Sequence, residues 1–398
     1  MTEASESGSV STELLALIQQ AIATAGGWLP FDRFMALALY APNVGYYSNA
    51  LPKFGAMPGS GSDFITAPEM SPFFGRALAV QVAQALRACG SDRVIEFGAG
   101  SGALAEQLLD ALAASAGAGA AAALNASITS YHIIELSSAL RARQQQRLAR
   151  FGARVQWLDA WPEVIDGVVI ANEVLDAMPV QWLHFDGAQW FERGVVWAAA
   201  GANEMAGAMG EVGTTGITGA ALRWRDQPTD LRPPFEGPFV PGTTTETHPQ
   251  ALAWTTGLAQ RLRCGVAILI DYGFPQAEYY HPQRSGGTLM CHRAHRADTD
   301  PLADVGLKDI TAHVDFSGIA LAAQAAGCEI VGYTSQARFL INCGLMALLE
   351  NATLAQRAMA QKLVTEHEMG ELFKVLALAR GCTFEPVGFS VGDRTHRL

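Results

Sequence analysis

Hydrophobic and polar positions follow two rhythms along this chain. Short, uninterrupted apolar runs alternate with longer stretches in which apolar residues recur every three or four positions. The first pattern is typical of buried strands and the second of amphipathic helices. The apolar runs lie at 93–97, 130–136, 153–158, 167–172 and 264–273, and the last two strands are expected at 328–333 and 381–391. Strands that alternate with helices predict an α/β fold with a mostly parallel, seven-stranded sheet.

Helices are expected before and between these runs. Helical spacing indicates helices at 11–25, 31–40, 102–115 and 137–151. A further helix is expected to begin at Ser71, whose side chain suits an N-cap, with Pro72 at the first helical position and Gly90 as a stop.

The pattern divides the chain into five parts. Residues 1–10 are polar and are expected to be a disordered tail, and 11–90 are expected to form an N-terminal helical region. Residues 91–179 read as the first part of a core and 263–398 as its second part with C-terminal helices. Between them, aromatic-rich runs joined by Asp186-Gly187 predict a β-hairpin within an insertion at 180–262.

Composition and charge narrow the class of protein. The chain has 398 residues, 49% of them hydrophobic and 16% charged, which suits a globular enzyme with a large core. The formal net charge is −11, which argues against nucleic-acid binding. The six cysteines form no C-x-x-C pair, and neither a leader segment nor a membrane span is apparent. These features predict a cytoplasmic protein without a metal site.

A glycine-rich turn follows the run at 93–97. A strand that ends in such a turn and opens a helix is a nucleotide-binding device, since small residues let the backbone approach the ligand. The spacing Gly98-x-Gly100-x-x-Ala103 fits a dinucleotide fingerprint, and Glu96-x-Gly98-x-Gly100-x-Gly102 fits S-adenosylmethionine (SAM) methyltransferases. The glycines alone leave NAD and SAM open.

Three carboxylates at strand ends favour SAM. Glu96 stands before the turn, where a negative charge suits an ammonium or sulfonium better than a pyrophosphate. Glu135 ends the second strand and can accept both ribose hydroxyls, which serves NAD equally well. Asp159 ends the third strand, where methyltransferases often meet the adenine. Each alone is also compatible with a solvated strand end, but three in order behind one glycine turn indicate a SAM site.

The fourth strand ends in a polar cluster of Asn172, Glu173 and Asp176. Acidic residues there suit a guanidinium, because arginine stays protonated in water and carboxylates can orient it through bidentate hydrogen bonds. The competing interpretation is a helix N-terminus with acidic residues that suit its dipole.

The order of several motifs resembles a known family, the MidA-like SAM-dependent methyltransferases. The motifs are "NVGYY", "SDFITAPEMSPFFGRALA", "VIEFGAGSGALAEQLL", "YHIIELSSALRARQQQRL", "VVIANEVLDAMPVQWL", "LIDYGF..AEYYHPQRSGGTLMCHRAHR" and "DITAHVDFSGIA". The resemblance implies a class I methyltransferase Rossmann-like core with N-terminal helices and an inserted subdomain. The family includes a mitochondrial complex I assembly factor that methylates an arginine, so the resemblance also implies protein arginine methylation.

The resemblance carries roles to individual residues. It implies that Asn172, Glu173 and Asp176 are catalytic. The residues that it implies for SAM binding are Thr66, Pro68, Glu96, Gly98, Gly100, Gly102, Glu135, Leu136, Asp159, Ala160 and Asn172, with the segment around 63–69 as a lid. The residues that it implies for the substrate cleft are Asp63, Glu69, Asp271, Tyr272, His281 and Arg284.

Three functional classes stay open at this point. The first is a methyltransferase acting on a protein arginine, in a respiratory complex I-type subunit or another protein. The second is a SAM-binding assembly factor that does little chemistry, and an NAD enzyme is a distant third. The expected partner is a protein substrate, without nucleic acid or a membrane span, and a homodimer is left open. Cys291, His292 and His295 lie close in sequence but do not reach the standard of a metal site.

Overall fold

A sheet of seven strands in a row forms the centre of the molecule in this computed structural model, which describes residues 3–49, 51, 65–114, 128–199 and 220–398. The strands, in spatial order, are β15 (Glu329–Ser335), β16 (Phe373–Arg380), β10 (Leu262–Phe274), β5 (Ile165–Asn172), β2 (Arg93–Phe97), β3 (Ser130–Ile134) and β4 (Val155–Leu158). The last five are mutually parallel, whereas β16 is antiparallel to both of its neighbours. The short strand β14 (Val314–Asp315) pairs with the end of β10. The predicted mostly parallel α/β sheet is confirmed, and its parallel strands place their carboxyl ends along one edge.

The last strand was wrongly predicted. It is β16, at Phe373–Arg380, and not the segment 381–391, which contains only a short 3-10 turn at Val387–Phe389. Gly381 turns the chain with φ 69°, and Pro386 has no N–H to offer a sheet ladder. Within "FKVLALAR", residues 375–379 form a continuous apolar run, which is typical of a strand buried on both faces.

Helices cover both faces of this sheet, because successive side chains of a strand point to opposite sides. In β5, for example, Val168 and Ile170 belong to one core cluster, and Val169 and Ala171 belong to the other. The first cluster is covered by α4 (Pro72–Cys89), α5 (Ala103–Ala114) and α10 (Gln336–Asn342), and the second by α7 (Pro249–Arg261) and α9 (Phe316–Ala325). Further helices around this sheet are α3 (Ala67–Met70), α6 (Ser138–Leu148), α8 (Gln276–Tyr279), α11 (Leu345–Leu348) and α12 (Leu354–Lys362).

The predicted boundaries of α4 are confirmed. The Ser71 hydroxyl accepts a hydrogen bond from the Phe73 N–H at 3.3 Å, and Pro72 occupies the first helical position. Gly90 ends the helix in the left-handed conformation with φ 61°. No helix among the described residues is long and apolar enough to cross a membrane.

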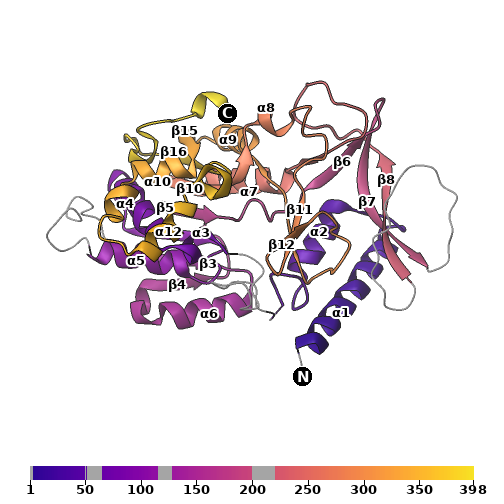
Figure 1. Cartoon of the computed structure of the whole chain (residues 1–398), viewed down its shortest axis with the longest axis horizontal. Coiled ribbons are helices and arrows are strands. Elements are labelled where there is room, and N and C mark those ends of the chain that lie inside the picture. Colours follow the sequence, from indigo (N-terminus) through magenta and orange to yellow (C-terminus); the bar gives the residue numbers. More distant parts are fainter. Residues whose placement is uncertain (1–2, 50, 52–64, 115–127, 200–219) are drawn as a thin grey trace.

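A second, antiparallel sheet stands beside the central one (Figure 1). It consists of β1 (Leu29–Pro30), β7 (Trp190–Ala199), β6 (Gln181–Phe185) and β9 (Thr243–Thr247), with β8 (Ala220–Pro228) also paired to β7. The predicted hairpin is confirmed: Phe185 faces Trp190, and Gly187 in the turn has φ 107°. Helices α1 (Glu3–Thr24) and α2 (Phe31–Tyr40) share a core cluster with this sheet.

Two features of this half bear on the predictions. The helix expected from residue 11 extends back through residues 3–10 as part of α1, so these residues do not form a disordered tail. A small third sheet, made of β11 (Met290–Arg293), β12 (Arg296–Asp298) and β13 (Asp309–Thr311), lies between the two larger halves (Figure 1). Its strand β13 reaches the carboxyl edge of the central sheet, where the candidate site lies. The chain divisions at 1–10, 11–90, 91–179, 180–262 and 263–398 stay predictions as domain boundaries.

Candidate active site

The glycine turn after β2 has a backbone that only glycine adopts easily. Gly98, Gly100 and Gly102 have φ values of 61°, 55° and 82°, which lie in the left-handed region. A Cβ on Gly98 would also meet Val174 Cγ2 at 3.0 Å. The turn therefore lies directly against the acidic segment that follows β5, and it leads into the N-terminus of α5.

A cavity of about 490 Å³ opens at this turn, within the range of about 300–1,000 Å³ that is common for small-molecule sites. It lies at the carboxyl ends of β2, β3, β5 and β10, as is usual for ligands of open α/β sheets. The predicted residues that line it are Thr66, Pro68, Glu96, Gly98, Gly100, Glu135, Leu136, Asn172, Glu173, Asp176 and Tyr272. The fold thus brings together predicted residues from five separate segments.

Other predicted residues lie off this cavity. Gly102 does not line the cavity, and a Cβ there would meet Leu148 Cδ1 at 3.4 Å and Gln144 Cγ at 3.5 Å. Asp159 and its neighbour Ala160 are not in the lining, because the Asp159 side chain is 85% exposed and pairs with Arg141.

The remaining members of the predicted cleft are also elsewhere. Glu69 accepts from the Ser101 hydroxyl and pairs with Arg147 at 3.0 Å. His281 accepts a backbone hydrogen bond through Nδ1, and the Arg284 guanidinium covers the Phe274 ring at 4.0 Å from its centre. Asp63 lies outside the described residues.

Two carboxyls, the buried Glu96 and the half-buried Glu135, lie beside the glycine turn, and both have hydrogen-bond partners. Tyr131 donates its hydroxyl to Glu96 Oε2 at 2.7 Å, yet burial raises the pKa of Glu96 to about 7. Glu135 accepts the Ser137 N–H through Oε1 and the Gln144 amide through Oε2, both at 2.9 Å. Burial also raises the pKa of Glu135. Each carboxyl oxygen keeps a second lone pair, so Glu135 retains the capacity to accept ribose hydroxyls.

The segment 173–176 after β5, called the acidic loop below, has a strained backbone and is fixed by hydrogen bonds to Asp271. Glu173 has φ 55°, an uncommon conformation for a residue with a side chain. Asp271 Oδ2 accepts the backbone N–H groups of Val174, Leu175 and Asp176 at 3.2, 2.9 and 3.2 Å. Asp271 therefore positions this acidic loop instead of lining the cavity.

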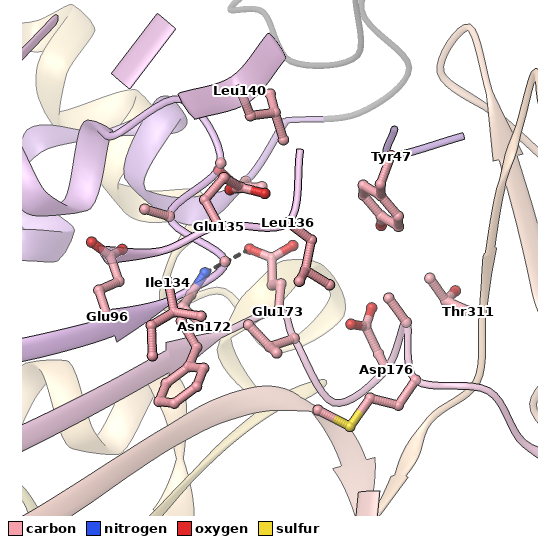
Figure 2. Close-up of a pocket in the computed structure, with 18 of the residues that line it drawn as sticks. Tyr47, Glu96, Ile134, Glu135, Leu136, Leu140, Asn172, Glu173, Asp176 and Thr311 are labelled. Atoms are coloured by element: carbon pink, nitrogen blue, oxygen red, sulfur yellow. Dashed lines mark hydrogen bonds between the residues drawn. The ribbon is translucent and has the colours of Figure 1, made fainter. Parts of the chain in front are cut away.

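The acidic loop directs two carboxyls into the cavity (Figure 2). Burial first, and then the charge of Asp271, raise the pKa of Glu173 to about 8 and raise the pKa of Asp176 well above its usual range. Asn172 donates its amide to Glu173 Oε1 at 3.1 Å. Among the described residues, Asn172 Oδ1 and Asp176 Oδ1 are buried without a hydrogen-bond partner, an unfavourable state that a bound donor would relieve.

The wall opposite this loop was missed by the sequence analysis. Tyr40, Tyr47, His292, Asp309 and Thr311 line the cavity there. The rings of Tyr40 and Tyr47 are stacked at 5.6 Å, and the Tyr47 hydroxyl donates to Asp309 Oδ2 at 2.9 Å. Both "NVGYY" and "DITAHVDF" were recognised as motifs, but nothing in either indicated that they meet across the cavity.

Aromatic side chains close the remaining side. Trp161 and Trp254 line the cavity and pack edge-on against Phe97, with ring centres at 4.8 and 5.1 Å. Among the described residues, no group of three or more His, Cys, Asp or Glu side chains could hold a metal ion.

The features of the site fit a cationic, nucleotide-like cofactor. Several of the carboxyls that face the cavity have raised pKa values and would be stabilised in their charged form by a nearby cation. The glycine turn gives a backbone surface, and the acidic end of β3 gives acceptors for hydroxyls. The parallel sheet, the turn and the cavity together define a class I methyltransferase fold with a Rossmann-like core.

Comparison with known proteins identifies the family. A family model described as "Putative S-adenosyl-L-methionine-dependent methyltransferase" matches residues 77–334. The chain belongs to this family of SAM-dependent methyltransferases, and SAM is its cofactor.

Solved structures and curated relatives agree with this family. A protein of Burkholderia thailandensis bound to S-adenosyl-homocysteine is 45% identical, with a TM-score of 0.88 over 99% of this chain and 98% of that one. A native crystal structure from the same organism is 44% identical, with a TM-score of 0.84 and the same coverage. The protein arginine methyltransferase NDUFAF7 homolog of Caenorhabditis elegans is 27% identical, over 93% of this chain and 88% of that protein. The Drosophila melanogaster homolog is also 27% identical, over 96% and 89%.

Proposed function

We propose that this methyltransferase transfers the methyl group of SAM to a guanidinium nitrogen of an arginine in a protein substrate. The observation that supports it is the acidic end of the cavity. Glu173 and Asp176 both face the cavity, and the principal charges that act on them are other carboxylates. A guanidinium is charged at every accessible pH and presents donors in a planar fork, so it would relieve this repulsion and satisfy the orphaned Asp176 Oδ1.

The end of the cavity at the glycine turn would hold the cofactor. Gly98 and Gly100 would present backbone to it, and Glu135 would accept its ribose hydroxyls. Thr66, Pro68 and Leu136 would supply further contacts from neighbouring segments. When bound, SAM supplies an electrophilic methyl group on a positively charged sulfur.

The chain's own residues would contribute orientation and a place for one proton. Glu173 and Asp176 would hold the guanidinium so that one nitrogen faces the methyl group. That nitrogen gains a methyl group and loses a proton, so the substrate keeps its single positive charge. The raised pKa of Glu173, about 8, suits it to accept this proton near neutral pH.

Other features of the proposal come from the resemblance and from the relatives' names. The curated relatives carry the name protein arginine methyltransferase, and the family resemblance makes a respiratory complex I-type subunit the first protein to test. A cytoplasmic location and a homodimer stay predictions. A SAM-binding scaffold with little catalysis is the alternative that the experiment must separate.

The experiment uses methyl-tritiated SAM and a lysate from cells that lack this protein. Addition of the purified protein is expected to label one or a few proteins, and amino-acid analysis is expected to recover the label as methylarginine. Label on another amino acid would contradict the arginine proposal. SAM binding without any transfer would favour the scaffold.

A calorimetric titration examines the cofactor end separately. A Glu135→Ala variant is expected to weaken SAM binding by about 10- to 100-fold, because it removes a half-buried acceptor of two hydroxyl hydrogen bonds. The matched control is Glu163→Ala, since Glu163 is an exposed loop residue. Equal affinity of the Glu135 and Glu163 variants would remove Glu135 from the cofactor site.

A further inference from the structure

Three half-buried cysteines lie close together at the edge of the central sheet that is opposite the cavity. Cys89 is the last residue of α4, Cys264 lies near the start of β10, and Cys382 follows β16. The cavity is at the carboxyl end of β10, whereas these residues lie at its amino end. The fold alone brings them together, because Cys89 and Cys382 are 293 positions apart in the chain.

The sulfur atoms of Cys89 and Cys382 are in direct contact, at 3.5 Å. Cys382 Sγ also lies 3.6 Å from the carbonyl oxygen of Gly265, which keeps the side chain against β10. A disulfide bond places its two sulfur atoms about 2 Å apart, so the two side chains together have to move by only about 1.5 Å. The pair is therefore close to the geometry of a disulfide without being bonded.

The surroundings of the pair allow both this movement and the approach of a small reagent. Residues 382–386 belong to no helix or strand, and the neighbouring Gly90 and Gly381 are exposed. The cysteines outside the cluster are buried, namely Cys291, Cys328 and Cys343. An oxidant in solution therefore meets the cluster first.

The three clustered cysteines do not form a metal site. In the described part of the chain, no group of three or more His, Cys, Asp or Glu side chains could hold a metal ion. Cys264 Sγ lies 3.3 Å from the carbonyl oxygen of Gly381 and 3.6 Å from that of Cys89, so it is directed at backbone. The chemistry that suits two thiols in contact is oxidation to a disulfide.

We propose that Cys89 and Cys382 are a site of reversible oxidation, at which a small disulfide such as oxidised glutathione converts the two thiols into one disulfide bond. The bond joins the end of α4 to the segment that follows β16. Helix α4 covers one face of the central sheet, and β16 is one of its strands. The proposal depends only on these residues and stands whether or not the protein methylates arginine.

The reaction consists of two thiol–disulfide exchanges. In the first, the Cys382 sulfur loses its proton and attacks one sulfur of oxidised glutathione, so that a mixed disulfide forms and one glutathione leaves as a thiolate that takes up a proton. In the second, the Cys89 sulfur loses its proton and attacks the Cys382 sulfur, and the other glutathione leaves in the same way. Two protein thiols are oxidised, and one disulfide is reduced to two thiols.

The contact between the two thiols determines the order and the speed of these steps. Burial raises the pKa values of both thiols, but at Cys382 the hydrogen bond with Cys89 opposes this effect. Cys382 therefore reaches the reactive thiolate form more easily and reacts first. The second exchange is fast, because the attacking sulfur of Cys89 is already beside its target.

The bond is expected to stabilise the folded chain without changing the cavity. A cross-link between residues 293 positions apart removes many conformations from the unfolded chain. The Tm of the oxidised protein is expected to exceed that of the reduced protein by about 3 °C or more. The affinity for S-adenosyl-homocysteine is expected to stay within about 3-fold, since distant sites act independently.

The experiment treats the wild-type protein with excess oxidised glutathione or with dithiothreitol, and then denatures and alkylates it. The intact mass of the oxidised protein is expected to show two fewer alkyl groups than the reduced protein, which has six cysteines. Peptide mapping is expected to join the Cys89 peptide to the Cys382 peptide, and dithiothreitol is expected to release the bond. Thermal unfolding and calorimetry with S-adenosyl-homocysteine are measured on both forms.

Two variants assign the bond to this pair. Cys382→Ser removes one partner, and its Tm is expected not to rise on oxidation. Cys264→Ser changes the third cysteine of the cluster and is the matched control, which is expected to form the bond and to gain Tm as wild type does. Each variant is compared with its own reduced form, so the cost of the substitution itself does not affect the comparison.

Three results would overturn the proposal. Wild-type protein that keeps all its thiols, or that stops at glutathione adducts, would show that the pair is not placed to react. A bond mapped to Cys264 would assign the reaction to a different pair. An unchanged Tm, or a loss of affinity for S-adenosyl-homocysteine on oxidation, would show that the bond is not a stabilising link away from the cavity. None of these results bears on arginine methylation, which the tritium assay tests separately.

Discussion

The carboxyls at the two ends of the cavity differ in their hydrogen bonding and in the charges around them. At the glycine turn, Glu135 has a partner on each oxygen and Glu96 receives a tyrosine hydroxyl. At the other end, the Asp176 Oδ1 is buried without a hydrogen-bond partner, and burial together with the charges of neighbouring carboxylates, Glu173 among them, raises the pKa of Asp176. The carboxyls at the first end therefore have hydrogen-bond partners even without a ligand. The second end stores unfavourable electrostatic energy in a strained loop, which is expected where a protein is prepared for a charged ligand.

This difference indicates which end determines what the enzyme acts on. Backbone at a glycine turn and a ribose acceptor serve any protein that binds this cofactor. Under the proposed function, the acidic loop would recognise a substrate that carries positive charge and several donors. Substitutions at the two ends should therefore separate cofactor affinity from methyl transfer.

The largest expected effect is that of Glu173→Gln on transfer. The amide keeps the shape of the side chain but cannot accept the proton that the guanidinium loses. The rate of tritium transfer is expected to fall by about 10²- to 10⁴-fold, the usual contribution of a positioned general base. The SAM affinity, measured by calorimetry, is expected to change far less. Glu163→Gln, on an exposed loop, is the control, and comparable activity of the two variants would remove Glu173 from the chemistry.

A smaller effect is expected at the opposite end, from Gly98→Ala. Gly98 and Gly90 have the same φ of 61°, so alanine is strained equally at both positions. Only Gly98 has a neighbour in the way, Val174 Cγ2 at 3.0 Å, whereas nothing lies within 4 Å at Gly90. Both variants are expected to lose about 1 kcal/mol of unfolding free energy from the strained backbone.

The cofactor affinity then separates the two glycines. Gly98→Ala is expected to bind SAM about 10-fold more weakly, because the turn must shift against the acidic loop. Gly90 ends helix α4 away from the cavity, so the Gly90→Ala variant should bind SAM as wild type does. If calorimetry gives the same affinity for both variants, the close approach of the glycine turn to the acidic loop has no bearing on cofactor binding.

The sequence predicts the two ends of the cavity unequally, for a physical reason. The glycine turn and the carboxyls at 96 and 135 sit at the ends of adjacent parallel strands, so the fold class alone brings them together. Asp309 and Tyr47 come from a small sheet and a loop whose meeting depends on how the antiparallel half packs on the core. No periodicity in either segment encodes that contact.

Two predictions from the sequence were wrong for local reasons: the place of Asp159 and the position of the last strand. The direction of the Asp159 side chain depends on Arg141 from a neighbouring helix, which a strand-end pattern does not reveal. The last strand was displaced because an alternating pattern around Pro386 resembles an edge strand, whereas the true strand is a continuous apolar run next to helical segments.

The smallest expected effect concerns stability, and it follows from the raised pKa of Glu173. Its pKa is about 8 in the folded protein against a usual value of 4.5, so the folded state binds more protons than the unfolded state between these two pH values. The stability linked to this group is therefore fully present below pH 4.5 and is lost as the pH rises through 8. Glu96 and Asp271 have pKa values of about 7, so the stability linked to their protonation is also lost as the pH rises. Both groups are present in wild type and in Glu173→Gln.

The difference between the two proteins therefore reports the ionisation of Glu173 together with the effect of its charge on Asp176. In thermal unfolding without cofactor, the Tm of Glu173→Gln is expected to exceed that of wild type by about 2 °C at pH 9 and to approach it at pH 5. Saturating SAM is expected to narrow the gap at pH 9, because a nearby positive charge stabilises the carboxylate of the wild type but has no charge to act on in the variant. A gap that is independent of pH would show that the carboxyl is ionised with its ordinary affinity for protons. The carboxyls of the acidic loop would then favour a bound cation no more than ordinary carboxylates do. The two ends of the cavity would differ only in their hydrogen bonding.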